Sequence, residues 1–205
     1  MTQYQTEQEN FWAGEFGEDY IGRNLGSKTL AANLALFSRI IPLTSGVDSL
    51  LEFGANIGKN LRALRLLLPE IKLSAVEINP KAAAELEKIG SIDVHNCSIL
   101  EFTPDTKKDM VLIKGVLIHM NPDVLQSVYQ KLYEASAKYI CIAEYYNPVP
   151  VELDYRGHTG KLFKRDFAGE IMEKYPDLEL IDYGFAYRND PNFEFGDVTW
   201  FLLRK

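Results

Sequence analysis

The sequence predicts an α/β protein built on a doubly wound sheet of seven mostly parallel strands, with an antiparallel C-terminal hairpin and an N-terminal helical lid. Three observations lead to this prediction. Strand-like and helical runs alternate between residues 48 and 145, the last two strand-like runs have no helix between them, and the first 26 residues are acidic and aromatic. Strand–helix alternation is typical of a parallel sheet covered on both faces. Strands joined without a helix pair as a hairpin.

Local signals give the elements in order. Ser27 suits a helix N-cap, and the helix over residues 28–41 ends before Pro42. Pro80 suits the first turn of a later helix, which ends at Gly90. Strands are expected at residues 48–53, 72–78, 92–99, 110–116, 139–145, 178–187 and 198–203, and further helices at residues 59–68, 80–90, 122–136 and 163–175. A loop rich in proline and glycine is expected before the last helix.

The composition fits one domain of 205 residues, of which 46% are hydrophobic and available for a core. Within this single domain we expect the lid in residues 1–42 and the core in residues 48–205. The net charge of −7 opposes binding to a phosphate backbone, so nucleic acid is not expected as a partner. We expect a monomer or a homodimer.

The chain also lacks signals for membranes and secretion. No run approaches the roughly 20 apolar residues of a membrane-spanning helix, and the start, MTQYQTEQEN, lacks the pattern of a secretory signal. Cys97 and Cys141 lie in strand-like runs, where thiols behave as small core residues. A cytoplasmic protein without structural disulfides or metal ligands is therefore expected.

The segment LLEFGANIGKN places a turn after the first strand, at the sheet edge where doubly wound folds bind ligands. Gly54 allows a positive φ and a close approach of a ligand to the backbone. Asn56 tolerates the same left-handed region, and Gly58 lets the next helix begin close to the strand. The alternative is a plain tight turn between a strand and a helix.

Two further segments favour a ligand that contains a nucleoside. Glu77 lies near the end of the second strand, where a carboxylate accepts hydrogen bonds from both ribose hydroxyls. Ser98 is placed to offer its hydroxyl to an adenine edge while Ile99 packs on the adenine face. The alternative for Glu77 is a solvated carboxylate at a strand end.

The turn does not suit a dinucleotide. A pyrophosphate requires G-x-G-x-x-G, because the middle glycine allows close backbone approach, and here Asn56 occupies the position of that middle glycine. Glu52, two residues before Gly54, would repel a diphosphate and suits a cationic ligand that carries an amino group.

The pattern E-x-G-x-N-x-G followed by VEINP resembles motif I and the next acidic strand of the class I S-adenosylmethionine-dependent methyltransferases. The resemblance implies a Rossmann-like methyltransferase fold and S-adenosyl-L-methionine as cofactor. It implies that Glu52 lies near the methionine amino group, with the turn from Gly54 to Gly58 around the methionine portion and Glu77 on the ribose. The complete predicted cofactor site is Trp12, Tyr20, Arg23, Glu52, Gly54, Ala55, Asn56, Gly58, Glu77, Ile78, Cys97, Ser98, Ile99 and Lys114.

Three blocks resemble more narrowly the methylases associated with pseudaminic acid biosynthesis. These blocks are FWAGEFGEDYIGRN, LLEFGANIGKNLRALRLLLP and LFKRDFAGE, the last continuing through DYGF to DPNFEFGDVTWFLLRK. The resemblance implies a small anionic acceptor, a nonulosonic-acid-type sugar or a sugar-nucleotide precursor, in surface-glycan biosynthesis. Whether oxygen or nitrogen accepts the methyl group stays open.

Catalytic candidates follow the fourth and fifth strands. His119 can accept a proton near neutral pH, although a capping or packing role is the alternative. In EYYNP, strand alternation would point Glu144 and Tyr146 to one face and Tyr145 to the other. We assign His119, Glu144 and Tyr146 to catalysis and Tyr145 to the substrate.

Basic and aromatic segments complete the predicted site. Arg156, Lys164 and Arg165 are assigned to an anionic substrate, because cations at a helix start oppose the helix dipole and therefore indicate an anion to bind. A solvated basic loop is the alternative. In the lid, Trp12 and Tyr20 offer aromatic faces to the sulfonium, and Arg23 is assigned to the methionine carboxylate. Alternatively, this aromatic stripe only docks the lid to the core.

Two competing functions are carried forward. The first is a nicotinamide-dependent sugar oxidoreductase on a similar sheet. The second is a protein that binds S-adenosylmethionine without catalysis and serves as an interaction partner in glycan assembly.

Overall fold

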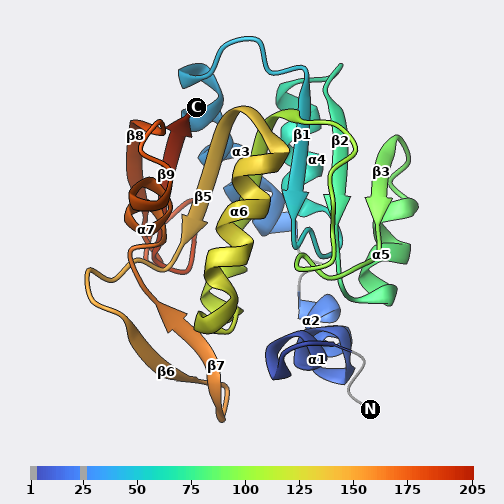
Figure 1. Ribbon diagram of the computed structural model, residues 1–205. Helices are drawn as coiled ribbons and strands as arrows, with labels where there is room; N and C mark the ends of the chain where they lie inside the picture. The colour runs from blue at the N-terminus through green and yellow to red at the C-terminus, as the bar shows by residue number, and fades with distance from the viewer. Residues whose placement is uncertain (1–3, 24–26) are drawn as a thin grey trace.

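A computed structural model describes residues 4–23 and 27–205, without the side chains of Arg23 and Ser27. Its main sheet has seven strands in the order β3-β2-β1-β4-β5-β9-β8 (Figure 1). The strands are β1 (Ser49–Phe53), β2 (Lys72–Val76), β3 (Ile92–His95), β4 (Lys108–Lys114), β5 (Ser136–Glu144), β8 (Glu179–Ala186) and β9 (Val198–Arg204). β1 to β5 are parallel, and β9 is antiparallel to both β5 and β8. The predicted sheet with its closing hairpin is confirmed.

Helices cover both faces of this sheet. The α-helices are α1 (Glu7–Ala13), α2 (Glu15–Arg23), α3 (Ser27–Ile40), α4 (Lys59–Leu67), α5 (Pro80–Glu87), α6 (Leu125–Ala135) and α7 (Phe167–Lys174). Short 3₁₀ turns are η1 (Ile41–Leu43), η2 (Leu117–His119) and η3 (Pro122–Val124). α3, α4 and α5 pack on one face, whereas α6 and α7 pack on the other. None of the described helices is long and apolar enough to span a membrane.

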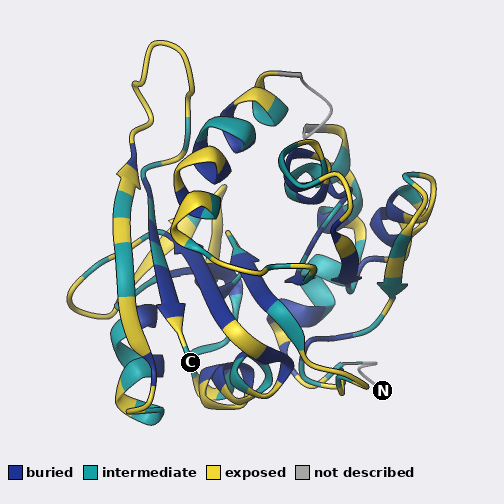
Figure 2. Ribbon diagram, turned by 90° about the horizontal axis from the view of Figure 1, so that it is seen from above, coloured by how far each residue is buried: buried dark blue, intermediate teal, exposed yellow. Residues whose placement is uncertain are grey.

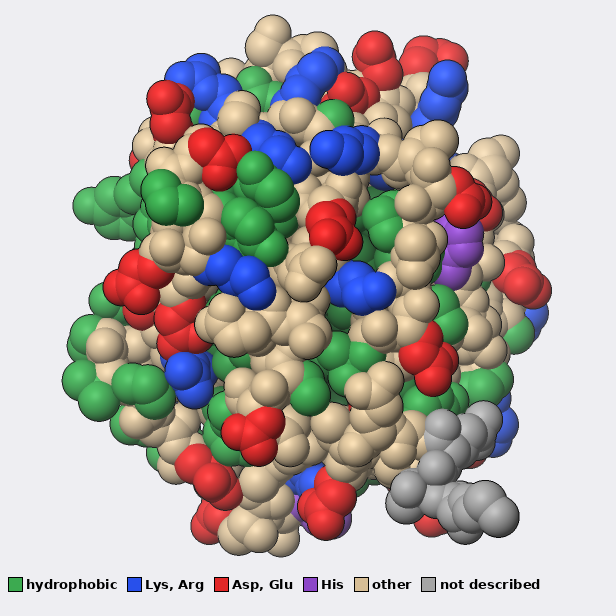
Figure 3. Space-filling view, viewed as in Figure 1, with side chains coloured by type: hydrophobic (Ala, Val, Ile, Leu, Met, Phe, Trp, Pro, Cys, Tyr) green, Lys and Arg blue, Asp and Glu red, His purple; other side chains and the backbone are tan. Residues whose placement is uncertain are grey.

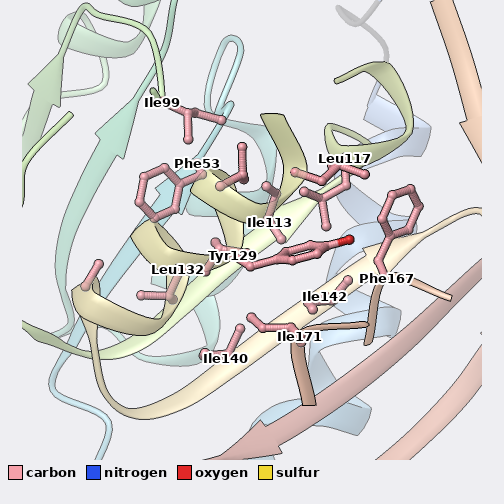
Figure 4. Packing of buried hydrophobic residues seen from close by; sticks show 14 of the residues in the cluster. Phe53, Ile99, Ile113, Leu117, Tyr129, Leu132, Ile140, Ile142, Phe167 and Ile171 are labelled. Atoms are coloured by element: carbon pink, nitrogen blue, oxygen red, sulfur yellow. The ribbon is translucent and has the colours of Figure 1, made fainter. Parts of the chain in front are cut away.

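Two hydrophobic cores result from alternation along the strands. Figure 4 shows Tyr129 of α6 and Phe167 of α7 packed with Ile113 and Ile142 on one face of the sheet. The neighbouring strand positions, such as Leu112, face the opposite core under α3 and α4. Because both faces are covered, the middle parts of the central strands, such as residues 110–113 and 139–143, are apolar and buried (Figure 2).

The edge strand β8 is much less buried than the central strands. Tyr183 and Phe185 are 63% and 51% exposed, and the Tyr183 ring stacks on Phe201 of β9 with centroids 6.2 Å apart. Figure 3 shows hydrophobic side chains gathered on the side of the molecule where Figure 1 places β8.

α1 and α2 lie beyond the carboxyl ends of the parallel strands (Figure 1). From here on, the word lid means these two helices only, and not α3, which packs on the sheet. α1 begins with a capping box: the Thr6 hydroxyl accepts from the backbone N–H of Glu9, and the Glu9 carboxylate accepts from the Thr6 N–H. Asn79, at the start of α5, fastens the lid by donating from its side chain to the carbonyl oxygen of Trp12 at 3.1 Å.

The segment before α7 corrects the sequence prediction. Residues 151–164 are not a loop but a hairpin of β6 (Val151–Tyr155) and β7 (His158–Lys164). Its turn is formed by Arg156 and Gly157, with φ of 53° and 84°. α7 therefore begins at Phe167 instead of residue 163, and Asp166 caps it by accepting from the Gly169 N–H at 2.8 Å.

Candidate active site

A cavity of about 300 Å³ lies where β1, β2, β4 and β5 end, between the sheet and the lid. Strand order reverses between β1 and β4, and such a switch point is where doubly wound sheets bind ligands. The volume and the mixed polar and aromatic lining are those of a small-molecule site. The β6–β7 hairpin and the loop between β8 and β9 contribute further wall residues.

The turn after β1 has the backbone that the sequence indicates. Gly54, Asn56 and Gly58 have φ of 72°, 48° and 77°. A Cβ on Gly54 would lie 2.5 Å from a methyl group of Val116, and one on Gly58 would lie 2.5 Å from Ile89. Gly54, Ala55 and Asn56 line the cavity, whereas Gly58 packs behind the turn against α5.

Glu77 holds this turn in place while facing the cavity. Its Oε2 accepts from the Asn56 N–H at 2.7 Å, and its Oε1 accepts from the Asn79 N–H at 2.8 Å. Burial raises the pKa of the carboxyl above its usual range, and these backbone hydrogen bonds oppose that rise. A carboxylate has about four acceptor positions, so Glu77 retains capacity for a ligand.

Glu52 lies behind the cavity wall. It is fully buried, and its Oε1 accepts from the side-chain amide of Asn60, which does line the cavity. Desolvation raises the pKa of Glu52 to about 8, partly offset by Asn60 and by the charge of Lys114. Lys114 itself lines the cavity with its Nζ 5.5 Å from the centre of the Phe195 ring, and burial lowers its pKa.

His119 faces the cavity from η2. Its Nδ1 lies 2.6 Å from the carbonyl oxygen of Lys161, so Nδ1 carries the proton and Nε2 is the acceptor nitrogen. Burial lowers the pKa of His119 to about 4. The rings of Trp12 and Tyr155 each have centroids 4.7 Å from the imidazole and fix its plane.

Glu144, the last residue of β5, is a buried carboxylate with one engaged oxygen. Its Oε1 accepts from the N–H groups of Val116 and Leu117, both at 2.9 Å. Desolvation raises its pKa to about 7, although these hydrogen bonds oppose the rise.

Unpartnered buried polar atoms concentrate around the cavity. In the described parts of the chain, eight buried side-chain nitrogen or oxygen atoms have no hydrogen-bond partner within the protein, and six belong to lining residues. The six are Gln8 Oε1, Trp12 Nε1, both amide atoms of Asn33, Asn60 Oδ1 and Glu144 Oε2. A seventh, Glu52 Oε2, lies directly behind Asn60. Because each such atom costs free energy unless it is satisfied, their grouping indicates a site built for a polar ligand.

Most of the predicted site residues meet at this cavity. Those that line it are Trp12, Tyr20, Gly54, Ala55, Asn56, Glu77, Ile78, Ser98, Ile99, Lys114, His119, Glu144 and Tyr145. Cys97 does not line it but packs against the core under α6. Arg23 lies outside the described side chains.

Tyr146 is not brought to the cavity. It is 41% exposed and its ring lies near that of Phe201, while its backbone forms an isolated β-bridge with Arg165. Glu144, the last residue of β5, therefore lines the cavity, whereas Tyr146 lies beyond the end of the strand and does not.

The predicted anion-binding residues are also elsewhere. Arg156 is exposed at the hairpin turn, and the Lys164 Nζ lies 5.3 Å from the centre of the Tyr145 ring without lining the cavity. Arg165 donates from Nε to Glu170 Oε1 at 2.7 Å. The physical reason is the missed hairpin: it carries these residues past the sheet edge and leaves Asp166, an anion, at the start of α7.

Many lining residues were not predicted, among them the polar or aromatic Gln8, Glu9, Asn33, Asn60, Tyr155 and Phe195. The T-x-x-E pattern of the α1 capping box is readable in the sequence and marks Glu9 as a helix-start residue, but not as a cavity residue. Tyr155 and Phe195 reach the site only because the hairpin and the β8–β9 loop fold over the same sheet edge.

The chain shares its fold with methyltransferases that have been solved with S-adenosylhomocysteine or S-adenosylmethionine. The chain superposes on the Burkholderia thailandensis 1,6-didemethyltoxoflavin-N1-methyltransferase, solved with 1,6-didemethyltoxoflavin and S-adenosylhomocysteine, with a TM-score of 0.68 at 14% identity, covering 100% of this chain and 92% of the other. It likewise matches the magnesium protoporphyrin IX methyltransferase of Synechocystis PCC 6803, solved with S-adenosylmethionine, with a TM-score of 0.67 at 10% identity over 100% of both chains.

The sequence comparison covers less of the chain than the structural comparisons do. The chain is 27% identical over 113 residues to a myricetin O-methyltransferase of Catharanthus roseus, a match that covers 53% of this chain and 31% of the plant protein. The match thus spans about a third of the length of this curated relative. No protein-family model matches the chain.

Proposed function

We propose that this protein is an S-adenosylmethionine-dependent methyltransferase that acts on a small molecule. The observation that carries the proposal is the grouping of unpartnered buried polar atoms around one cavity at the carboxyl ends of the strands. Glu77 and the left-handed turn at Gly54 and Asn56 bound that cavity on one side. The fold shared with methyltransferases solved with the cofactor or its product supports the same assignment.

The residues present fit S-adenosylmethionine along its length. Glu77 would accept from the ribose hydroxyls, and Ile78 and Ile99 would border the adenine. Asn60 has a free amide oxygen for the methionine amino group, backed by the Glu52 carboxyl, and Lys114 supplies a cation for the methionine carboxylate. When bound, the cofactor supplies an electrophilic methyl group on a sulfonium.

The other half of the cavity would hold the acceptor. His119 Nε2 would take the proton from an acceptor hydroxyl, and the Lys161 carbonyl keeps the imidazole in the tautomer that permits this. Glu144 Oε2 is a second acceptor atom that would orient the same group. Tyr145 and Tyr155 line the cavity beside them and would hold the acceptor in line for transfer.

A sugar-type acceptor is proposed on the resemblance of the terminal blocks to the pseudaminic-acid-associated methylases. Aromatic walls such as Trp12, Tyr145 and Tyr155 offer flat surfaces for the C–H groups of a sugar ring. No arginine lines the cavity among the described residues, so an acidic group of the acceptor would meet Lys114 or Lys59.

The test is product formation. The protein would be incubated with S-adenosylmethionine and a panel of nonulosonic acids, their sugar-nucleotide precursors, simple phenols and N-heterocycles, and mass spectrometry would detect the gain of one methylene mass. His119→Asn should form the product far more slowly, and His95→Asn, which replaces a histidine outside the cavity lining, should form it at the wild-type rate. Binding of S-adenosylhomocysteine without methylation of any acceptor would favour the non-catalytic alternative. Methylation of phenols alone would refute the sugar-type acceptor but not the methyltransferase.

A further inference from the structure

We propose that Glu9 of the lid recognises the 6-amino group of the cofactor's adenine, so that base recognition and lid docking are one event. The inference rests on the proposed function, because it needs an adenine in the cavity. Glu9 is only 5% exposed although it lies in the first turn of an N-terminal helix. It lines the cavity together with Ser98 and Ile99, at the end where the base would lie.

The hydrogen bonds of Glu9 leave a carboxylate acceptor facing this end of the cavity. Oε2 accepts from the Thr6 N–H at 2.8 Å and from the Thr6 hydroxyl at 3.0 Å. Oε1 accepts from the Ser98 hydroxyl. Each carboxylate oxygen has two lone pairs, so Oε1 has an acceptor position left.

This arrangement changes the role predicted for Ser98. Its hydroxyl has a single proton, which it donates to Glu9, and its oxygen accepts from the Leu100 N–H at 3.1 Å. Ser98 therefore does not donate to the base. It holds the Glu9 carboxylate, and that carboxylate is the polar group at this corner of the cavity.

A capping box alone does not account for this placement. A capping glutamate satisfies the helix start equally well when it is exposed to solvent, and burying a carboxylate costs free energy. Here the glutamate is turned inward and joined to a residue 89 positions away in sequence. An adenine amino group is a donor and matches the carboxylate, whereas the 6-oxo group of hypoxanthine is an acceptor and would face it unfavourably.

The lid would then respond to the cofactor. Trp12 lies in the same helix as Glu9, and its ring packs on His119 with centroids 4.7 Å apart. The Gln8 side chain, also in α1, donates to the Gly160 carbonyl of the hairpin at 2.9 Å. An adenine that binds Glu9 would thus hold α1 in place, and α1 also carries the Trp12 ring that packs on His119.

The experiment compares S-adenosylhomocysteine with S-inosylhomocysteine, which differs only in carrying the 6-oxo base, by calorimetric titration of the full chain. The wild type should bind the adenine compound more tightly by about tenfold to a hundredfold, the scale of a hydrogen bond to a charged group. Glu9→Gln, whose amide both donates and accepts, should narrow this ratio to within about threefold. Glu15→Gln, an exposed glutamate at the start of α2, is the matched control and should leave the ratio unchanged.

The outcomes separate this inference from the function on which it rests. Equal binding of the two compounds by the wild type would overturn the role of Glu9 while leaving the methyltransferase proposal intact, and this comparison needs no variant to fold. A Glu9→Gln protein that weakens both compounds equally would also overturn it, because Glu9 would then only fasten the lid. Failure of both compounds to bind would refute the proposed function itself.

Discussion

The Nδ1 atom of His119 lies 2.6 Å from the carbonyl oxygen of Lys161, and this contact joins the turn after β4 to the β6–β7 hairpin. Because a carbonyl oxygen only accepts, the contact fixes the neutral tautomer with its free lone pair on Nε2. Trp12 from the lid and Tyr155 from the hairpin flank the ring. The basic nitrogen of the site therefore depends on three segments that are distant in sequence.

His119→Asn should lower kcat by about 10²–10⁴-fold, the usual contribution of a general base, while the affinity for S-adenosylhomocysteine stays unchanged. Because burial lowers the pKa of His119 to about 4, its neutral form persists at all higher pH values, and the rate should show no loss near pH 6.5 from this residue. Steady-state kinetics across pH and calorimetry measure both effects. A kcat within twofold of the wild type would exclude His119 as the base.

Glu52→Gln should stabilise the protein at alkaline pH and weaken cofactor binding. Desolvation raises the pKa of Glu52 from 4.5 to about 8, so between these values the folded state binds more protons than the unfolded state and stability falls as pH rises. Removing the carboxyl should therefore give a gain of roughly 1–3 kcal/mol above about pH 8 and little gain near pH 5. Urea unfolding of the wild type and the variant, at about pH 5 and again above about pH 8, measures this difference in the free energy of unfolding.

The exposed Glu87→Gln serves as the control for this comparison. The raised pKa of Glu144 remains in both proteins, so the difference between them isolates Glu52. An equal effect of Glu52→Gln at both pH values would contradict the account.

Gly54→Ala should destabilise the protein by roughly 1–3 kcal/mol, because φ is 72° and the new Cβ would lie 2.5 Å from a Val116 methyl group. Gly22→Ala, within helix α2 and with no atom within 4 Å of the added Cβ, should be neutral or stabilising. Thermal and urea unfolding of both variants checks this. If the two substitutions changed stability equally, the turn after β1 would not be constrained at Gly54 as described.

Arg165→Ala should lower stability by about 1–2 kcal/mol without a specific loss of turnover. Its Nε bonds Glu170 Oε1 at 2.7 Å, and Glu170 Oε2 accepts from the Tyr129 hydroxyl at 2.7 Å, so the substitution breaks a partly buried network. Arg62→Ala, an exposed arginine on α4, should change stability by less than about 0.5 kcal/mol. A specific rise in the KM for the acceptor would instead return Arg165 to the substrate site.

The central strands of the main sheet were predictable because their apolar runs are buried on both faces. β1 is predicted at residues 48–53 and lies at Ser49–Phe53. β3 ends at His95, four residues earlier than predicted, because the Asn96 side chain turns back to bond the Glu77 carbonyl at 2.8 Å. The β6–β7 hairpin was not predicted, because β6 and the start of β7 are exposed and the alternation of Val151, Leu153 and Tyr155 in β6 covers only five residues.

The residues of the candidate site also fall into a predictable and an unpredictable group. Residues at or just after strand ends, such as Glu77, Lys114 and Glu144, were predictable because a parallel sheet brings its carboxyl ends together. Glu9 and Tyr155 were not, because tertiary contacts of the lid and the hairpin bring them in. The basic residues were misplaced because the hairpin that carries Arg156 and Lys164 was not predicted.

The most direct test of the central claim is calorimetric titration with S-adenosylhomocysteine and, separately, NADH, on the wild type and Glu77→Ala. The account predicts saturable one-site binding of S-adenosylhomocysteine, none of NADH, and a loss of about 1.5–3 kcal/mol of binding free energy on replacing the carboxylate that we assign to the ribose. The exposed Glu87→Ala should bind as the wild type does. Binding of NADH in preference to S-adenosylhomocysteine, or an affinity that Glu77→Ala leaves unchanged, would contradict it.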